Sequence, residues 1–337
     1  ADDTAAVVVI SRDSSEAADY STDMKCSSPD DSFERPLALS QNEKDMLSLA
    51  KSHSKKVIVH INSDSPMEID ELKNDAGINS ILWTGEPGIN GFLGIADVIA
   101  GNVSPSGHLP DTYAKNATSS PSMVNFGVYT YENNSQNSKE LKDTDRGDWY
   151  VVESEGIYVG YKYYETRYED TVLGQGNAST ADSEYDYTKQ VQYPFGYGIS
   201  YTQFDYSDFS LTENGDNFTA QVTVTNSGDV AGKDVVEGYF QSPYTDYDRE
   251  NLVEKSAVEL CGFEKTGELA PGESETVSID IPKETLRAYD YTNAKTYIVD
   301  DGTYYFAIGD DCHQALNNIL AAKGYTTADG MDADGDD

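Results

Sequence analysis

The chain has 337 residues, of which 38% are hydrophobic and 11% aromatic, enough to build real cores. This length leaves room for about two domains, because single cores rarely grow beyond roughly 250 residues. Sixty acidic residues against 23 basic ones give a formal net charge of −37. Such a charge repels phosphate backbones and anionic membrane surfaces, so we expect no nucleic-acid or membrane partner, whereas an uncharged ligand is not disfavoured.

The sequence contains no recognisable targeting or membrane-spanning segment. No apolar run approaches the ~18 residues that cross a bilayer. The N-terminal stretch ADDTAAVVVI lacks a basic region and a small-residue cleavage site, so it is not a signal peptide. We therefore expect a soluble chain that begins with a cut made just before a buried strand. A bacterial-type cytoplasmic location and a secreted one both stay open.

The cysteines and histidines are scattered along the chain and show no C-x-x-C spacing. An odd number of isolated cysteines argues against both a disulfide framework and a zinc site. We therefore predict no metal and no cofactor. The residues concerned are Cys26, Cys261, Cys312, His53, His60, His108 and His313.

The first third of the chain alternates short apolar runs with helical patterns. Val7 to Ile10 is predicted to be a buried strand from its length and β-branching. A helix is expected after Ser40, where an S-x-x-E capping box precedes an apolar face. Apolar strands are predicted at residues 57–61 and 78–83, and another helix opens at Gly88. Apolar strands separated by helices indicate a parallel sheet covered on both faces.

The middle of the chain is polar and rich in tyrosine. Residues 116–147 shift to Ser, Asn, Thr and Asp, which indicates a long surface segment. Residues 155–165 then alternate with a period of two, the spacing of a strand. A second polar insert precedes the tyrosines between Tyr185 and Tyr206, which we interpret as packing between domains. We assign residues 116–200 to a long loop and an inter-domain connection.

The remainder consists of short alternating strands separated by Gly, Pro and Asn turns, the pattern of an antiparallel β-sandwich. CHQALNNILAAKG looks helical, and we interpret the following acidic residues as a solvated tail. The spacing of Asp332, Asp334 and Asp336 hints at a calcium loop, but the required glycine and distal Glu are missing. The domains expected are thus residues 1–115, an α/β sandwich incomplete at its N-terminus, residues 201–311, the β-sandwich, and residues 312–337, a helix and tail.

Two segments of the chain, GNVSPSGHLP and YPFGYGISYT, are individually quite specific motifs. Five others accompany them in a fixed order: VVVISRDSSEAAD, LSQNEKDMLSLA, KKVIVHINSDSPMEI, EGIYVGYKYYE and VTVTNSGDVAGKDVVEGYF. Together these segments cover most of the chain and resemble glycoside hydrolase family 3, the family of β-glucosidases and β-xylosidases. The resemblance implies a partial α/β/α sandwich with a mainly parallel sheet, followed by a fibronectin type III-like β-sandwich. The predicted fold class is therefore α/β plus all-β.

The resemblance also implies chemistry that this chain does not complete. Members of the family are typically retaining enzymes whose Asp nucleophile sits on a (β/α)8 barrel, while the acid/base Glu comes from the α/β sandwich domain. The chain shows no run of eight βα units, so we expect the nucleophile on a polypeptide segment outside it. Most members place the barrel first, but the C-terminal helix and tail resemble those of members with the reversed order, which we favour slightly.

Glu16 is the predicted acid/base residue. In many relatives the loop reads S-R-x-S-G-E-G-x-D-R, so SRDSSEAADY places Glu16 on the acid/base Glu. A loop just past the carboxyl end of a buried parallel strand suits this role, because ligands bind at that edge. We expect Arg12 and Asp19 to brace the loop through an ion pair. A solvated carboxylate at Glu16, or the same role for Asp13 or Asp19, stays open.

The loop also departs from the family pattern. Ser15 and Ala17 stand where glycines are usual, and Tyr20 replaces an arginine. The lost glycines restrict the backbone and the lost arginine removes a charge that could order the loop. These departures favour, modestly, an alternative in which the loop has lost its catalytic role.

Other polar and aromatic residues are weaker candidates for the functional site. Asn62 and Ser63 end the second strand, where we favour turn chemistry over a role in the site. Trp83 is expected in the core, and Glu68 and Glu86 are expected to cap or solvate their helices. Trp149 follows the polar loop and is a candidate to stack on a sugar ring, although an anchor for the loop is as probable.

The sequence therefore predicts the non-barrel portion of a retaining, β-glucosidase-like glycoside hydrolase, inactive by itself. Its expected partners are a β-linked glucoside or short oligosaccharide and the (β/α)8 barrel of the same enzyme. Two alternatives are a β-xylosidase or related exo-glycosidase of the family and a non-catalytic carbohydrate-binding or structural module. Sugar, linkage and oligomeric state stay open.

Overall fold

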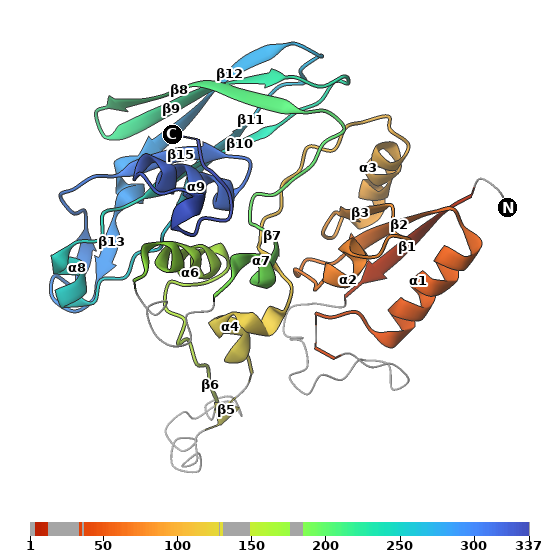
Figure 1. Ribbon diagram of the computed structural model, residues 1–337, viewed down its shortest axis with the longest axis horizontal. Coiled ribbons are helices and arrows are strands. Elements are labelled where there is room, and N and C mark those ends of the chain that lie inside the picture. The colour runs from red at the N-terminus through yellow and green to blue at the C-terminus, as the bar shows by residue number, and fades with distance from the viewer. Residues whose placement is uncertain are drawn as a thin grey trace. The chain divides into compact units, whose positions relative to one another are not determined.

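Figure 1 shows a computed structural model of the chain. The structure describes residues 4–12, 34–35, 37–127, 129–130, 149–175 and 185–336. The chain divides into two compact units. Unit 1 comprises Ala1–Glu86 with Ala114–Val159, and unit 2 comprises Pro87–Tyr113 with Gly160–Asp337.

A three-stranded parallel sheet forms the centre of unit 1, in the order β1-β2-β3. Its strands are β1 (Ala5–Ser11), β2 (Lys56–Asn62) and β3 (Ser80–Trp83). Val8 pairs with Val59 and Ile10 with Ile61, and all four are buried. The predicted parallel sheet is therefore confirmed. The expectation that Val7–Ile10 is buried throughout was wrong, because Val7 and Val9 are 49% and 43% exposed and only the face with Val8 and Ile10 is buried.

Helix α1 (Gln41–His53) begins where the sequence predicts. The Ser40 hydroxyl accepts from the Glu43 backbone N–H, and the Glu43 carboxylate accepts from the Ser40 N–H at 2.8 Å. This capping box satisfies two amide groups that the first turn of a helix leaves without a partner. Leu47 is the buried residue of the helix.

The rest of unit 1 consists of short elements. They are α2 (Asp70–Lys73), η1 (Ala117–Ser119), α4 (Pro121–Val124), β5 (Tyr129–Thr130) and β6 (Trp149–Tyr150). Strand β5 pairs antiparallel with β6, and the rings of Tyr129 and Tyr150 stack with centroids 5.5 Å apart. Strand β4 (Tyr113–Ala114) lies at the boundary of the two units.

Unit 2 is dominated by two antiparallel sheets, β11-β10-β15 and β12-β9-β8. The strands are β8 (Phe204–Asn214), β9 (Asn217–Asn226), β10 (Val235–Gln241), β11 (Glu259–Lys265), β12 (Ser274–Pro282) and β15 (Tyr305–Gly309). Val222 and Val224 of β9 share a buried core with Val236 and Phe240 of β10. The predicted β-sandwich is therefore confirmed.

Unit 2 also contains smaller elements. They are α3 (Gly88–Ile99), α6 (Tyr161–Leu173), α7 (Tyr187–Gln190), β7 (Val191–Tyr193), α8 (Asp246–Asn251), η3 (Lys283–Leu286), β13 (Ala288–Asp290), β14 (Thr296–Ile298), α9 (Cys312–Ala322) and η4 (Thr327–Asp329). Helix α9 was expected from the sequence. No described helix has the length and apolar character needed to cross a bilayer.

Two expectations about unit 2 were wrong. The period-two alternation of residues 155–165 does not continue as a strand, because α6 begins at Tyr161. Tyr164, Tyr168 and Val172 recur every four residues and are buried on one face, so helical spacing decided the local structure. The C-terminal residues are not a free solvated tail either, since Met331 is 4% exposed and Asp332 is hydrogen-bonded to α6 and α9.

Candidate functional site

The predicted catalytic residue Glu16 and its neighbour Asp19 lie outside the described residues, so their roles stay predictions. Strand β1, which precedes them in the chain, ends at an edge of the sheet suited to ligand binding. Strand β1 ends at Ser11, directly beside Asn62 at the end of β2, and the Asn62 amide donates to the Ser11 hydroxyl at 3.4 Å. The segment carrying Glu16 therefore starts at the carboxyl edge of the parallel sheet, where ligands bind in such folds.

Arg12, the last residue before this segment, is almost fully enclosed. Its guanidinium makes a bidentate pair with Glu43, through a short Nη1–Oε1 contact and an Nη2–Oε2 hydrogen bond of 2.9 Å. The same Nη2 donates to the Ala38 carbonyl at 2.7 Å. The side chains of Arg12 and Glu43 are 6% and 14% exposed. Glu43 thus caps α1 and holds Arg12 with one carboxylate, a partner that sequence reasoning did not find.

A second arginine–glutamate pair lies just after the segment. Arg35 donates to Glu68 from Nε at 2.8 Å and from Nη2 at 2.6 Å. The Glu68 carboxylate also accepts from the Ala117 backbone N–H at 2.8 Å. The hydrogen bonds to Glu68 raise the pKa of Arg35, against the effect of burial. Glu68 was expected to cap or solvate a helix, and this was wrong, because it is 6% exposed and belongs to this network.

The remaining polar residues at the sheet edge bond to one another. The Trp83 indole N–H donates to the Ser63 carbonyl at 2.8 Å, and the Ser63 hydroxyl accepts from the Ser65 N–H. His60 is 1% exposed and shares a 2.7 Å hydrogen bond with Thr84, and burial lowers its pKa. Ser63 therefore makes the turn contacts expected of a strand end, while Trp83 is only half-buried.

Trp149, the other predicted sugar contact, opens strand β6 opposite Thr130. Its side chain falls outside the described part of the structure, so stacking on a sugar ring stays a prediction.

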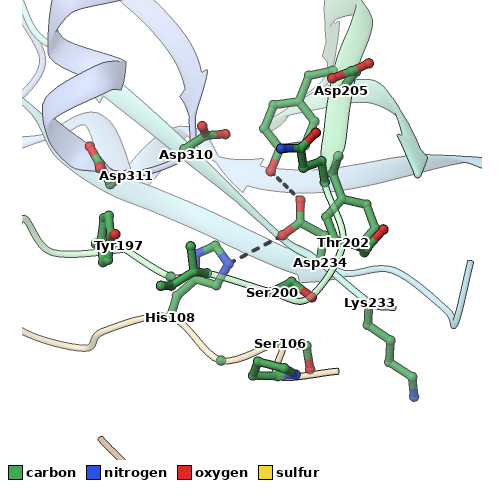
Figure 2. A pocket seen from close by; sticks show the side chains of 17 residues that line it. Ser106, His108, Tyr197, Ser200, Thr202, Asp205, Lys233, Asp234, Asp310 and Asp311 are labelled. Carbon is green, nitrogen blue, oxygen red and sulfur yellow. Dashed lines mark hydrogen bonds and ion pairs between the residues drawn. The ribbon is translucent and has the colours of Figure 1, made fainter. Parts of the chain in front are cut away.

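Unit 2 contains a polar pocket of about 420 Å³, lined by residues 105–108, 197–200, 202–206, 233–234 and 310–311. Figure 2 shows Asp234 joined to His108 and to a tyrosine hydroxyl. His108 Nε2 lies 3.4 Å from Asp234 Oδ1, and Tyr206 donates to Asp234 Oδ2 at 2.6 Å. Burial favours neutral His108, but the hydrogen bond and charge of Asp234 outweigh it and raise the pKa of His108.

Two further carboxylic acids line this pocket at the start of α9. Burial raises the pKa of Asp310, and it raises the pKa of Asp311 to about 6. The Asp311 carboxylate caps α9 by accepting from the backbone N–H groups of His313 and Gln314. No group of three His, Cys, Asp or Glu side chains among the described residues could hold a metal ion. The pocket therefore offers charged hydrogen-bonding groups rather than a metal centre.

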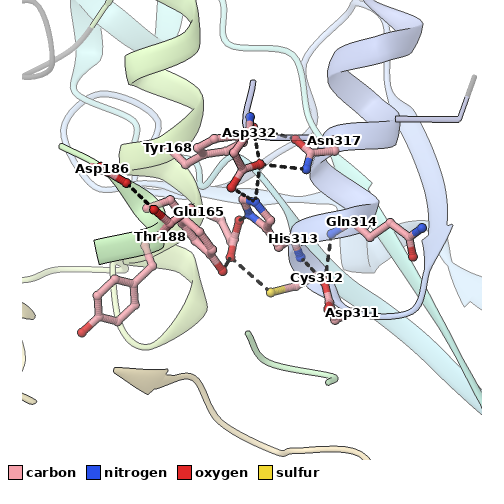
Figure 3. Close-up of polar contacts among 12 residues, drawn as sticks. Glu165, Tyr168, Asp186, Thr188, Asp311, Cys312, His313, Gln314, Asn317 and Asp332 are labelled. Atoms are coloured by element: carbon pink, nitrogen blue, oxygen red, sulfur yellow. Dashed lines mark hydrogen bonds and ion pairs between the residues drawn. The ribbon is translucent and has the colours of Figure 1, made fainter. Parts of the chain in front are cut away.

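A second buried polar cluster joins α6, α9 and the C-terminal residues (Figure 3). His313 lies between two carboxylates: its Nδ1 is 2.7 Å from Glu165 Oε2, and its Nε2 is 3.0 Å from Asp332 Oδ1. Tyr168 donates to Asp332 at 3.0 Å and accepts from the Asp332 backbone N–H at 2.9 Å. This arrangement attaches the C-terminal residues to the helices.

The surroundings of His313 explain its charge. The Tyr187 ring stacks on the imidazole with centroids 3.7 Å apart, and its hydroxyl donates to Glu165 at 2.6 Å. Burial opposes protonation, but the charge of Glu165 and the hydrogen bonds to both carboxylates raise the pKa of His313 to about 10. Glu165 is fully buried. The cluster has the character of a structural ion pair, and its distant segments gave no sequence signal.

The comparison with protein-family models decides the family. The glycosyl hydrolase family 3 C-terminal domain matches residues 1–201, and a fibronectin type III-like domain matches residues 234–312. The chain belongs to glycoside hydrolase family 3. The resemblance and the fold class inferred from the sequence are thereby confirmed. The finer division at residues 115, 200 and 311 stays a prediction.

Curated β-glucosidases are similar to most of this chain. A β-glucosidase of Ruminococcus albus is 32% identical over 285 residues, 82% of this chain and 25% of the relative. β-Glucosidase A of Butyrivibrio fibrisolvens is 32% identical over 289 residues, 80% of this chain and 30% of the relative. The chain thus spans between a quarter and a third of the length of these enzymes.

Solved structures of the family share the architecture. β-Glucosidase 3B of Thermotoga neapolitana, solved with α-D-glucose, has a TM-score of 0.66 and 30% identity, covering 91% of this chain and 36% of that one. A β-glucosidase of Paenibacillus barengoltzii has a TM-score of 0.68 and 26% identity, covering 90% of this chain and 28% of that one.

Proposed function

We propose that this chain is the non-barrel portion of a retaining, β-glucosidase-like hydrolase. In this proposal Glu16 is the general acid/base, and an Asp nucleophile lies on a (β/α)8 barrel outside the chain. The observation that carries the proposal is the family match together with the position of the Glu16 segment at the carboxyl edge of the parallel sheet. A β-linked glucoside or short gluco-oligosaccharide is the proposed substrate.

The chemistry needs two carboxyl groups about 5–5.5 Å apart across the glycosidic bond. Protonated Glu16 donates its proton to the leaving oxygen while the Asp attacks the anomeric carbon, and the C–O bond breaks to give a glycosyl–enzyme. The Glu16 carboxylate then takes a proton from water, which attacks the same carbon and releases the sugar and the Asp. Glu16 therefore returns to its protonated form at the end of each cycle.

Replacing Glu16 tests this assignment in the complete enzyme, with the barrel present. We expect Glu16→Ala to lower kcat by roughly 10²–10⁴-fold on substrates that need acid assistance. Azide should restore part of the activity towards aryl glucosides with good leaving groups, since this anion attacks the anomeric carbon without a base, releasing the Asp and forming a glycosyl azide. Glu71→Gln is the control, because Glu71 is an exposed partner of Lys44 in the same unit. Unchanged turnover by Glu16→Ala would remove Glu16 from the site.

The isolated chain tests whether the site is shared. Without the barrel it lacks the proposed nucleophile, so the purified chain should not hydrolyse an aryl β-glucoside, and adding the barrel-bearing polypeptide should be required for turnover. Specific turnover by the chain alone, retained after chromatography, would contradict the split site.

A non-catalytic carbohydrate-binding module is the second candidate, and the departures at Ser15, Ala17 and Tyr20 favour it. Calorimetric titration of the isolated chain with gluco-oligosaccharides separates the two functions. A binding module should bind these sugars alone, whereas half a pocket should bind them hardly at all. A third possibility is a β-xylosidase or related exo-glycosidase. Because subsites on the barrel decide which sugar is bound, this possibility is tested by measuring the activity of the complete enzyme on a panel of glycosides.

A further inference from the structure

The segment that carries Glu16 is bracketed by two enclosed arginine–glutamate pairs. Arg12 precedes it and binds Glu43 with both guanidinium Nη atoms. Arg35 follows it and binds both carboxylate oxygens of Glu68. The side chains of Arg12 and Glu43 are 6% and 14% exposed, and those of Arg35 and Glu68 are 24% and 5% exposed. In the nearby pair Lys44–Glu71 the side chains are 36% and 61% exposed.

We propose that Glu43 and Glu68 are positioning residues for catalysis, because they hold the two ends of the segment from which Glu16 acts. This inference rests on the proposed role of Glu16. Neither glutamate is placed against the substrate. Each acts through an arginine, and the arginine in turn holds the backbone at one end of the segment.

The contacts tie the two ends to each other as well as to the sheet. Arg12 donates to the carbonyl of Ala38, beyond the far end of the segment, at 2.7 Å. The neighbouring Leu37 carbonyl accepts from the Glu68 backbone N–H at 2.9 Å. Leu37 and Ala38 are themselves 7% and 6% exposed. Both pairs therefore converge on the same short stretch of buried backbone.

The geometry of the two arginine–glutamate pairs favours a role in positioning the segment between them over a role in stabilising the fold. A buried ion pair is weak evidence for stability, because removing two charges from water offsets much of their attraction. A planar guanidinium bound by a carboxylate at two atoms does fix orientation as well as distance. Glu43 and Glu68 each also accept a backbone N–H, from Ser40 and Ala117, which anchors the pairs to defined parts of unit 1.

Catalysis is sensitive to such anchoring. A displacement of about 1 Å far from the reacting atoms can cost roughly 10²-fold in rate. Proton transfer in both halves of the proposed reaction requires Glu16 at a defined place. Loosening either end should therefore lower kcat much more than it changes KM.

The test uses Glu43→Gln and Glu68→Gln in the complete enzyme. Glutamine keeps the shape of the glutamate side chain and one oxygen acceptor. It therefore weakens the ion pair with the arginine while the packing stays nearly the same. We expect each variant to lower kcat by roughly 10–100-fold with KM within a factor of about two. The loss should be larger for an alkyl glucoside than for a nitrophenyl glucoside, because only the poor leaving group needs full acid assistance. Arg12→Lys keeps the charge without the planar fork and should behave like Glu43→Gln.

The background of Glu16→Ala separates positioning from a general structural effect. If Glu43 and Glu68 act through Glu16, adding either glutamine to Glu16→Ala should give no further loss of kcat. Glu71→Gln, which breaks only the exposed pair with Lys44, should leave both kcat and its leaving-group dependence unchanged. Tm measurements on every variant verify that the proteins compared are folded.

Three results overturn the inference. The first is wild-type kcat in both glutamine variants. The second is a double variant with Glu16→Ala whose kcat falls by the product of the two single losses. The third is an equal loss for good and poor leaving groups. If Glu16→Ala itself leaves turnover intact, the proposed role of Glu16 falls and this inference with it. If Glu16→Ala suppresses turnover while Glu43→Gln and Glu68→Gln do not, only the positioning role is wrong.

Discussion

Two regions of the molecule bury charge in different ways. In unit 1, guanidinium groups bind carboxylates at both ends of the Glu16 segment, through Arg12–Glu43 and Arg35–Glu68. In unit 2, the His313 imidazole lies between Glu165 and Asp332. The first region surrounds a segment with a proposed catalytic residue, and the second joins two helices to the C-terminal residues.

The difference lies in which charges can titrate. A guanidinium stays protonated throughout the neutral and alkaline range, so a rise in pH does not remove the charge that holds the arginine pairs together. An imidazolium can lose its proton, and the attraction of both carboxylates is then lost. The two pairs next to the proposed catalytic segment thus rely on a cation that does not titrate near neutral pH, whereas the His313 cluster links stability to pH.

The two tryptophans allow the regions to be followed separately. Trp83 and Trp149 both belong to unit 1, and the sequence contains no others. Tryptophan fluorescence therefore reports unit 1, whereas far-UV circular dichroism reports both units. A change seen by circular dichroism but not by tryptophan fluorescence is therefore a change in unit 2.

His313→Gln should have the largest effect on stability. It removes the cation and leaves Glu165 as a buried carboxylate without its ion-pair partner, which costs about 3–5 kcal/mol. Urea unfolding followed by circular dichroism should show the loss, while the tryptophan signal should shift less. Equal shifts in both signals would mean that the two regions unfold as one, and no shift in either would contradict a charged cluster.

Stability should fall as pH rises past the ordinary pKa of histidine. Because the folded-state pKa of His313 is raised from 6.5 to about 10, its stabilisation is complete below pH 6.5 and is lost as pH rises towards 10. Circular-dichroism melting curves at pH 6.5, 8 and 9.5 should show a falling Tm, and His313→Gln should flatten this dependence. The tryptophan-monitored Tm should change little over the same range, since arginine pairs do not titrate there. A wild-type Tm independent of pH would contradict the prediction.

Asp332→Asn should have an intermediate effect. It weakens the bonds to His313 and Tyr168 but leaves the pair of His313 with Glu165 in place. We expect a loss of about 1–2 kcal/mol, below the usual range for charged hydrogen bonds because Asp332 is partly exposed. Trypsin should also cleave faster after Lys323 as the C-terminal residues detach. Wild-type cleavage and stability would show that Asp332 does not hold this segment.

Glu71→Gln should have the smallest effect. The Lys44–Glu71 pair is largely exposed and solvent-screened, so its loss should change the free energy of unfolding by less than about 0.5 kcal/mol. Tryptophan-monitored urea unfolding gives the value. A loss approaching that of His313→Gln would mean that exposure does not separate strong from weak pairs in this molecule.

Local patterns in the sequence predicted local structure well. The β-branched run at Val7–Ile10 and the capping box at Ser40 each involve residues close together, and the structure has the strand and the helix there. Residues 155–165 show the limit, because a short period-two pattern gave no hint of the helical repeat that continues to Val172.

The polar networks could not be predicted in the same way. Glu165 and His313 are 148 residues apart, and Arg12 and Glu43 are 31 apart, so their meeting depends on the folded chain. The sequence predicted that Arg12 braces the loop through an ion pair with Asp19, and this stays a prediction because Asp19 lies outside the described residues. The structure adds Glu43, which the sequence indicated only as a helix cap.

The central claim is a catalytic site shared between this chain and a barrel. A 2-deoxy-2-fluoro-β-glucoside with a good leaving group traps the covalent glycosyl–enzyme of a retaining enzyme, and peptide mass spectrometry then locates the sugar. In the complete enzyme we predict a label on an Asp outside these 337 residues, with the label still forming in Glu16→Ala. A label on a carboxylate within this chain, Glu16 included, would contradict the account.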